Sequence, residues 1–262
     1  MSRLKKLRNL FKAYKLNGYI VPKNDEFFGE YVDHGDDKLN YISSFSGSAG
    51  FGLILEKKAY LFVDGRYTLQ AKKEVNKNFK IIEIHKIKPS KLLEKINKKL
   101  IIGFDPKLFN ETNLINNFRK KNITLIPIEK NLIDKIWSKK TKVKINKFFI
   151  LDSKYVGKNY KMKINIISKI LKEKKINKLL ITAPENLAWM LNIRGKDSKY
   201  SPLPNCHGII DNKKKITLIV NKSKINNKFR SYFKNILNYI SSSDITKYFN
   251  SLNNKEIFLI DK

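Results

Sequence analysis

The side chains that most often bind metal ions are few and scattered in this sequence. The histidines are His34, His85 and His207, and the only cysteine is Cys206. A structural metal site needs about four ligands held together, and no Cys-x-x-Cys or His-Glu-x-x-His spacing supplies them. The acidic run at 33–37 lacks the spacing of a calcium loop and reads as a solvated surface loop. The sequence therefore predicts no metal centre.

Glycines and serines near position 50 do not form a known catalytic or phosphate-binding pattern. Gly47, Gly50 and Gly52 precede an apolar strand rather than a helix, so the helix N-terminus that holds phosphate in nucleotide-binding loops is missing. There is no Gly-Lys-Ser/Thr step, and Ser46 and Ser48 do not lie in a Gly-x-Ser-x-Gly elbow. We expect the glycines to allow tight turning and close packing at a sheet edge.

Two longer motifs are more specific. The first covers 41–50 (YISSFSGSAG) and continues at 62–70 (FVDGRYTLQ). Asp64 and Arg66 flank a glycine at a strand end. We expect a charge-assisted hydrogen bond between them to fix the turn from strand to helix, which makes both of them structural residues.

The second motif covers 188–197 (AWMLNIRGKD). Trp189 and Asn192 lie where a helix is expected to end, and both are interpreted as structural. Arg194 and Asp197 follow in a loop, and two readings stay open for them. A polar loop so close to a tryptophan can serve internal structure. It can also form a rim that faces a substrate, because loops on a rigid scaffold often carry function.

Alternating helices and strands must position these motifs. Apolar residues at helical spacing predict helices, and short apolar runs bounded by Gly, Pro or Asn predict strands. The expected strands are 19–21, 50–55, 59–63, 79–84, 100–104, 123–128, 179–182, 208–211, 215–220 and 257–260. The expected helices are 4–16, 66–76, 90–98, 111–121, 160–174, 184–191, 229–239 and a last one capped by Ser243 or Asp244. We expect Asn17-Gly18 to end the first helix as a left-handed cap and Ser90 to cap the third.

This alternation predicts an α/β fold with sheets covered by helices. The length of 262 residues suggests two domains. Residues 138–148 are rich in lysine and nearly lack apolar periodicity. They are expected to link a first domain over 1–137 to a second over 149–262. Each half carries a strand hairpin between helices, which predicts two units of similar plan.

The net charge of +32 does not by itself identify a ligand. The basic residues are 49 lysines and only 6 arginines, spread along the chain, whereas arginine is preferred at phosphate forks and base edges. Lysine, asparagine and isoleucine share A/T-rich codons, so compositional drift accounts for the charge. Nonspecific polyanion binding stays an alternative. No apolar run reaches the roughly 18 residues of a membrane helix, and a single cysteine fits a reducing compartment.

The two motifs together resemble the N-terminal half of Xaa-Pro aminopeptidases (aminopeptidase P) in the creatinase/prolidase family. The family pattern SGFTGSAG, followed by DGRY and a Gln, appears here at 43–50 and 64–70. The pattern ITAPENLAW-x-LN-x-RG appears at 181–195, and a Tyr-x-Pro step follows at 200–202. The motifs occur in the family's order and cover nearly the whole chain, so the resemblance is specific.

The resemblance implies two tandem creatinase N-terminal-like domains with ribonuclease-H-like α/β folds, each a mixed sheet flanked by helices. In the family, a C-terminal pita-bread domain follows and binds two manganese or similar divalent ions through two Asp, one His and two Glu. That catalytic domain has no counterpart in this sequence. The resemblance therefore implies no catalytic residue, no metal ligand and no cofactor in this chain, and it makes Arg194 and Asp197 candidates for the substrate rim.

The leading hypothesis is the N-terminal, non-catalytic portion of a cytoplasmic Xaa-Pro aminopeptidase, a metallopeptidase of family M24, as a truncated product or an incomplete gene model. The parent reaction releases an N-terminal residue that precedes proline. We expect the chain alone to be inactive, because two-metal hydrolysis needs the ions. The alternative is a stand-alone binding or assembly module. Expected partners are a second copy or a separate catalytic domain, with peptide substrate only in the full-length context, and neither a specific nucleic acid nor a membrane.

Overall fold

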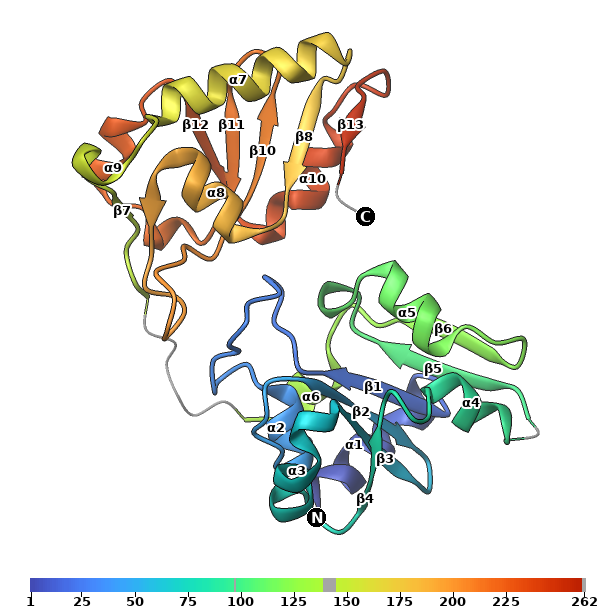
Figure 1. Cartoon of the computed structure of the whole chain (residues 1–262). Helices are drawn as coiled ribbons and strands as arrows, with labels where there is room; N and C mark the ends of the chain where they lie inside the picture. Colours follow the sequence, from blue (N-terminus) through green and yellow to red (C-terminus); the bar gives the residue numbers. More distant parts are fainter. Residues whose placement is uncertain (97, 139–144, 261–262) are drawn as a thin grey trace. The chain divides into compact units, whose positions relative to one another are not determined.

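The computed structural model describes residues 1–96, 98–138 and 145–260 (Figure 1). These residues form two compact units, one on each side of the gap at 139–144. The linker predicted over 138–148 therefore falls largely outside the described residues. At its C-terminal end, Phe148 is fully buried in the core of the second unit, and its N–H donates to the carbonyl oxygen of Lys224 (3.0 Å).

The first unit is built on a six-stranded mixed sheet in the order β4-β3-β2-β1-β5-β6. Its strands are β1 (Gly18–Pro22), β2 (Gly50–Leu55), β3 (Ala59–Val63), β4 (Phe79–Glu83), β5 (Leu100–Phe104) and β6 (Ile123–Pro127). Strands β1, β2 and β3 pair antiparallel, whereas β4, β5 and β6 each join by a parallel pairing. The sheet is thus an antiparallel centre with parallel strands on both sides.

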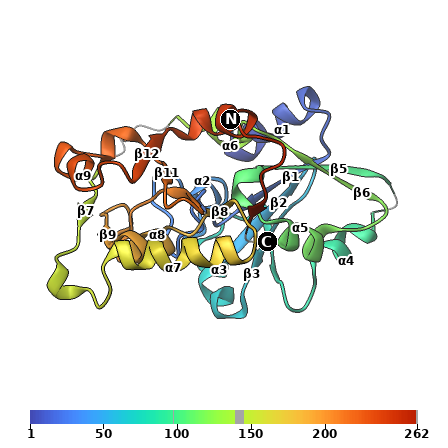
Figure 2. The ribbon, with the colours of Figure 1, turned by 90° about the horizontal axis from the view of Figure 1, so that it is seen from above.

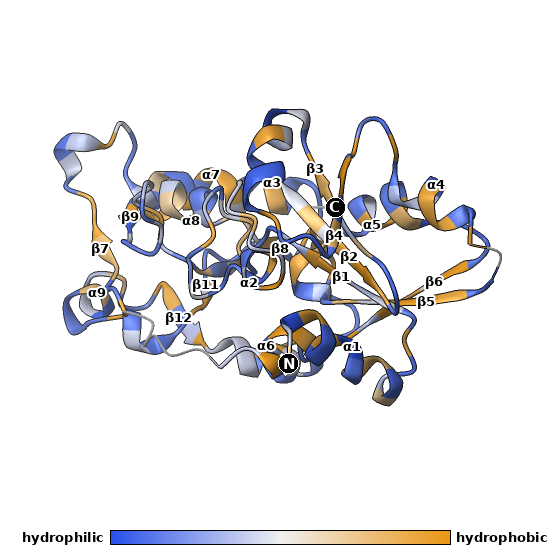
Figure 3. Ribbon diagram, turned by 90° about the horizontal axis from the view of Figure 1, so that it is seen from below, coloured by the Kyte–Doolittle hydropathy of each residue, from blue (hydrophilic) through white to orange (hydrophobic). Residues whose placement is uncertain are grey.

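Two hydrophobic cores cover the two faces of this sheet. Successive strand residues point to opposite faces, so in β1 Tyr19 and Val21 join one core while Ile20 joins the other. The first core receives the apolar faces of α1 (Arg3–Ala13), α2 (Lys38–Ser43), α3 (Thr68–Glu74) and α6 (Leu132–Ile136). The second receives α4 (Pro89–Glu94) and α5 (Glu111–Phe118). Figure 3 shows the apolar character of β5 and β6 in orange.

The second unit repeats this plan in a five-stranded mixed sheet with the order β12-β11-β10-β8-β13. Its strands are β8 (Lys178–Ile181), β10 (His207–Asp211), β11 (Ile216–Ile219), β12 (Leu237–Ile240) and β13 (Phe258–Leu259). The antiparallel trio β8-β10-β11 again carries a parallel strand on each side. A separate ribbon pairs β7 (Phe149–Ile150) with β9 (Ile193–Arg194). The two units therefore correspond strand by strand, with β6 as an extra edge strand in the first.

Helices α7 (Tyr160–Glu173) and α8 (Pro184–Leu191) lie together on one side of the second sheet (Figure 2). They share a single core with α9 (Asn227–Tyr232), while α10 (Ile245–Asn250) precedes β13. Short 3-10 turns are η1 (Gly65–Tyr67), η2 (Pro106–Leu108), η3 (Ser153–Tyr155), η4 (Lys222–Lys224) and η5 (Ser242–Asp244). The predicted α/β class, with mixed sheets flanked by helices, is confirmed. No helix in the described ranges is long and apolar enough to span a bilayer.

The prediction of a single helix over 229–239 is wrong. Helix α9 ends at Tyr232, and residues 237–240 form strand β12, which pairs with β11. Between them Asn235 adopts a left-handed φ of 69°, a conformation that asparagine tolerates better than most residues. Phe229 and Phe233 have helical spacing and both pack in the core. This spacing suggested a longer helix, although α9 ends at Tyr232, before β12 begins.

The expected cap of the first helix is also wrong. Helix α1 ends at Ala13, and the left-handed residue after it is Lys15 (φ 52°). Gly18 instead lies in β1, where a Cβ would be 2.7 Å from Leu55 Cδ2. The glycine is therefore needed for close packing inside the sheet rather than for a helix end.

Two smaller differences concern short helices. The sequence predicts Ser90 as an N-cap, but α4 begins at Pro89 with Lys88 before it, and Ser90 is buried within the first turn. Proline is well suited to the first helical position because its missing N–H has no partner there. Helix α6 is not predicted, since five residues are too few to display a helical period.

Candidate functional site

The turn after β3 is fixed by Asp64 and Arg66. The Oδ1 atom of Asp64 accepts hydrogen bonds from the Arg66 backbone N (3.0 Å) and the Arg66 Nε (2.8 Å). These two bonds hold the pKa of Asp64 below its usual value. Both side chains are exposed, and their bonds to each other give them a local role in starting η1.

Glu74 joins the two halves of the first motif. Its carboxylate accepts from the Ser46 backbone N (2.8 Å), from Ser46 Oγ (2.8 Å) and from Gln70 Nε2 (2.9 Å). Partial burial alone would raise the pKa of Glu74, but the hydrogen bonds from Ser46 and Gln70 outweigh it and keep the pKa below its usual value. A further bond links Ser48 Oγ to Tyr67 Oη (2.6 Å). The loop after α2 is thus fastened to α3.

A buried aromatic ring packs under the contact between the loop after α2 and helix α3. Phe45 is fully buried and meets Tyr67 edge to face, with ring centroids 5.9 Å apart. A Cβ on Gly47 would lie 2.3 Å from Phe45 Cζ, so only glycine lets the loop cross the ring. The polar groups of the first motif therefore form hydrogen bonds with one another above a packed core. This arrangement indicates a structural role for the motif.

Lys163 of α7 holds the C-terminal end of α8. Its Nζ donates to the Trp189 carbonyl oxygen (2.6 Å) and to Asn192 Oδ1 (2.5 Å), and it lies 4.4 Å from the centroid of the Trp189 ring. Asn192 caps the helix in a left-handed conformation (φ 53°), and its Nδ2 donates to the Lys158 carbonyl oxygen (3.1 Å). Burial lowers the pKa of Lys163, and the charge of Arg194 adds to this effect.

Sequence reasoning does not single out Lys163. The lysine is hidden among many others in α7, yet it shares the buried helix face with Tyr160 and Ile164. A lysine at an apolar position of a helical period is the signal that could have found it, because a buried cation needs partners to offset the loss of water.

Arg194 lies in β9, opposite Phe149 of β7. Its Nη1 donates to the carbonyl oxygens of Ala188 (3.1 Å) and Ile193 (2.8 Å). The first of these belongs to the last turn of α8, where carbonyl groups lack helical partners and a positive charge is favourable. Arg194 is half-buried, whereas the neighbouring Trp189 is 57% exposed.

Asp197 is enclosed by its own loop. Its Oδ2 accepts from the Asn205 backbone N (2.8 Å) and forms an ion pair with Lys224 Nζ (2.8 Å), which leaves the side chain only 6% exposed. The loop is tight, because a Cβ on Gly195 would lie 2.7 Å from the Leu203 carbonyl oxygen. The two candidate rim residues thus differ, with Arg194 nearer the surface and Asp197 inside.

The described residues do not supply the ligands of a dinuclear metal centre. No group of three or more His, Cys, Asp or Glu side chains in residues 1–96, 98–138 and 145–260 comes close enough to hold an ion. Cys206 is fully buried, and burial raises its pKa to about 12. It is therefore a protonated thiol at neutral pH rather than a nucleophile.

Comparison with known proteins gives these motifs a family. Two family models, both described as the creatinase/prolidase N-terminal domain, match residues 3–136 and 138–262. The chain belongs to this family. The prediction of two tandem creatinase N-terminal-like domains is confirmed, and the matches divide the chain near the gap between the two units.

Curated relatives extend well beyond the matched region. "Xaa-Pro aminopeptidase 1" of Dictyostelium discoideum is 32% identical over 266 residues, covering 92% of this chain and 42% of that protein. "Probable Xaa-Pro aminopeptidase P" of Coprinopsis cinerea is 30% identical over 246 residues, covering 88% of this chain and 38% of that protein. The chain thus spans less than half the length of these relatives and matches their N-terminal portion.

A solved structure of similar fold covers both units. X-prolyl aminopeptidase from Caenorhabditis elegans, described as a cytosolic enzyme with a di-nuclear active site, matches with a TM-score of 0.86 over 98% of this chain and 46% of that one. The sequence identity is 24%, so this similarity establishes the fold alone.

Proposed function

We propose that this chain is the non-catalytic N-terminal portion of an Xaa-Pro aminopeptidase. The parent reaction is the metal-dependent release of an N-terminal residue that precedes proline. The observation that carries the proposal is coverage: the chain aligns over 92% of itself but 42% of the Dictyostelium discoideum enzyme. The described residues also lack a group of three metal ligands. In this proposal the two divalent ions and the groups that hold them come from outside the chain.

The proposal gives the end of α8 a place at the substrate entrance. Arg194 is half-buried and its Nη1 is anchored on the carbonyl oxygens of Ala188 and Ile193; in this proposal its guanidinium also binds the peptide. Trp189, five residues earlier in the sequence, is exposed. Asp197 supports the rim from within, because its pairing with Lys224 fixes the loop that follows Arg194. A single buried cysteine is in keeping with the cytoplasm as the compartment.

Immunocapture of the native product tests this proposal. An antibody raised against the recombinant chain is used on a cell extract, and the captured material is examined by intact mass and by release of amino acid from an Xaa-Pro peptide. We expect peptidase activity in the captured material, carried by a polypeptide heavier than 30.7 kDa or by a second chain captured with it. A product of 30.7 kDa with no associated peptidase activity would contradict the proposal.

A second candidate function is a separate assembly module, and the edge of the second sheet favours it. Ile257, Leu259 and Ile260 at strand β13 are 56%, 43% and 55% exposed. Exposed apolar residues on an edge strand form a docking surface for another chain. The partner would be a separately encoded catalytic domain or a second copy. Light scattering of the purified chain, with Leu259→Lys as the variant, separates self-association from a monomer that awaits another partner.

A further inference from the structure

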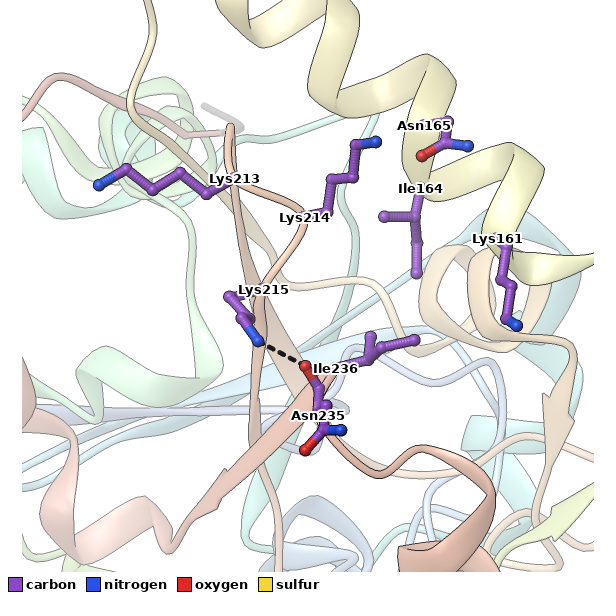
Figure 4. A pocket seen from close by; sticks show the side chains of 8 residues that line it. All are labelled: Lys161, Ile164, Asn165, Lys213, Lys214, Lys215, Asn235 and Ile236. Carbon is purple, nitrogen blue, oxygen red and sulfur yellow. Dashed lines mark hydrogen bonds between the residues drawn. The ribbon is translucent and has the colours of Figure 1, made fainter.

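A cavity of about 290 Å³ opens in the second unit where three segments meet (Figure 4). Helix α7 contributes Lys161, Ile164 and Asn165, the β10–β11 turn contributes Lys213, Lys214 and Lys215, and the connection before β12 contributes Asn235 and Ile236. Lys161 lies about 200° around α7 from Lys163. Lys161 is therefore turned away from the contacts that Lys163 makes with α8, whereas Ile164 lies on the buried face of α7 that Lys163 shares.

Asp211 holds the backbone of the β10–β11 turn. Asp211 Oδ1 accepts from the backbone N atoms of Lys213 and Lys215, both at 2.8 Å. Lys214 between them has a left-handed φ of 71° and points toward α7, whereas Lys213 points away from the cavity (Figure 4). Lys215 Nζ donates to the Asn235 carbonyl oxygen at 2.6 Å. The turn backbone is thus fixed, and the side chain of Lys215 is anchored on Asn235.

The charged residues that line the cavity are all positive. None of the eight described residues that line it carries a carboxylate, and the lining includes three exposed lysines, Lys161, Lys214 and Lys215. The first turn of α7 has no acidic residue, although the positive end of the helix dipole favours negative charge there. The carboxylate of Asp211 is committed to backbone N–H groups of the turn. An anion in the cavity would relieve repulsion among the lysines and complement the helix end.

We propose that this cavity binds a small anion with two or three linked phosphate groups, either free or carried by a nucleoside. Lysine ammonium groups act as point charges that bind phosphate oxygens, and three of them, one on α7 and two on the β10–β11 turn, match a chain of phosphates better than a single one. The volume lies at the lower end of the range for ligand pockets, about 300 Å³, which favours a small ligand. The site is independent of the peptidase function proposed above.

Calorimetric titration of the full 262-residue chain with tripolyphosphate, and separately with ATP, tests the proposal in about 0.15 M salt, where weak surface attraction is screened. The variant Lys161→Gln/Lys214→Asn removes two charges from the cavity, and asparagine tolerates the left-handed backbone at 214. The matched control Lys247→Gln/Lys255→Asn removes two exposed lysines from the same unit outside the cavity.

We expect saturable binding at one site per chain. The cavity variant should weaken it about tenfold or more, as expected for the loss of two charged contacts, and the control by less than about twofold. Tighter binding of ATP than of tripolyphosphate assigns the site to a nucleotide, and the reverse order assigns it to free polyphosphate. Absence of saturable binding, or equal weakening by both variants, would overturn the proposal. If the double variant does not fold, Lys161→Gln alone must weaken binding more than Lys247→Gln.

Discussion

Lys163 shows how one side chain sets the geometry of a motif that lies elsewhere in the sequence. Its three contacts are a backbone carbonyl oxygen, an amide oxygen and an indole ring, all near the end of α8. The Asp64–Arg66 contact involves residues two apart on a strand end, which is why spacing alone suggests it. Lys163 is separated from Asn192 by 29 residues, and no local pattern in the sequence connects them.

Replacement of Lys163 by methionine should destabilise the second unit by about 2 kcal/mol, because two acceptors in a buried position lose a charged donor. The stem volume is kept, so packing loss is small. Lys169→Met on the exposed side of the same helix should change stability by less than about 0.5 kcal/mol. Urea unfolding followed by Trp189 fluorescence, in a Trp137→Phe background, measures both. Equal effects of the two replacements would contradict the role given to Lys163.

Glu74 makes the stability of the first unit depend on pH in the acidic range. Because hydrogen bonds from Ser46 and Gln70 keep its pKa below the usual 4.5, the folded state binds its proton less readily than the unfolded state. Its contribution is present above pH 4.5 and is lost as the pH falls through the folded-state pKa. When the pH is lowered from neutral to below the folded-state pKa of Glu74, the Glu74→Gln variant should therefore lose less stability than the unaltered chain.

Thermal unfolding at a series of pH values measures this difference. The exposed Glu129 offers a control, since Glu129→Gln should follow the unaltered chain. A Glu74→Gln profile parallel to that of the unaltered chain would show that the carboxylate contributes no acid-dependent stability.

Several elements follow the sequence closely because strong local signals bound them. Strands 50–55, 59–63 and 100–104 and helix 184–191 have the predicted limits, set by glycine, lysine turns and a proline at the first helical position. The end of α9 is not readable in this way, because no glycine or proline marks the break at Asn235 between this helix and β12. Strand β9 is also missed, since two residues paired with β7 carry no period of their own.

The loop between β9 and β10 depends on the absence of a side chain at Gly195. A Cβ there would lie 2.7 Å from both the Leu203 carbonyl oxygen and Pro204 Cα, and backbone atoms cannot yield as a flexible side chain can. Gly195→Ala should destabilise the second unit by about 2 kcal/mol or more. Gly157→Ala has nothing within 4 Å of the new Cβ and should be neutral or slightly stabilising.

Denaturant unfolding of the two glycine variants side by side measures the difference. Comparable stability of both variants would mean that the loop relaxes around the added methyl group. The rim geometry proposed for Arg194 would then not depend on the close approach of residues 195 and 203.

The whole molecule combines two units of matching plan with a net charge of +32. Self-repulsion of this size weakens a compact state, and salt screens it over a Debye length of about 10 Å at 0.1 M. The melting temperature should therefore rise when sodium chloride is increased from about 0.01 to 0.2 M. Differential scanning calorimetry checks this, and a melting temperature that is constant or falls would show that the basic residues are not a source of instability.

The family assignment rests on motifs distributed over both units, which is why the sequence could predict it. The rim role of Arg194 and Asp197 could not be judged from sequence, because their burial depends on contacts with α8 and Lys224. The cavity was equally hidden, since its lysines come from two segments about 50 residues apart in sequence and resemble the many others in the chain.

Release of an amino acid from an Xaa-Pro peptide by the purified 262-residue chain tests directly whether this chain is non-catalytic. The assay uses added Mn²⁺, with and without a chelator, and the full-length Dictyostelium discoideum relative as a positive control. We expect no release above buffer for this chain under any of these conditions, because its described residues hold no group of three metal ligands. Robust release that the chelator abolishes and that co-purifies with the chain would contradict this expectation.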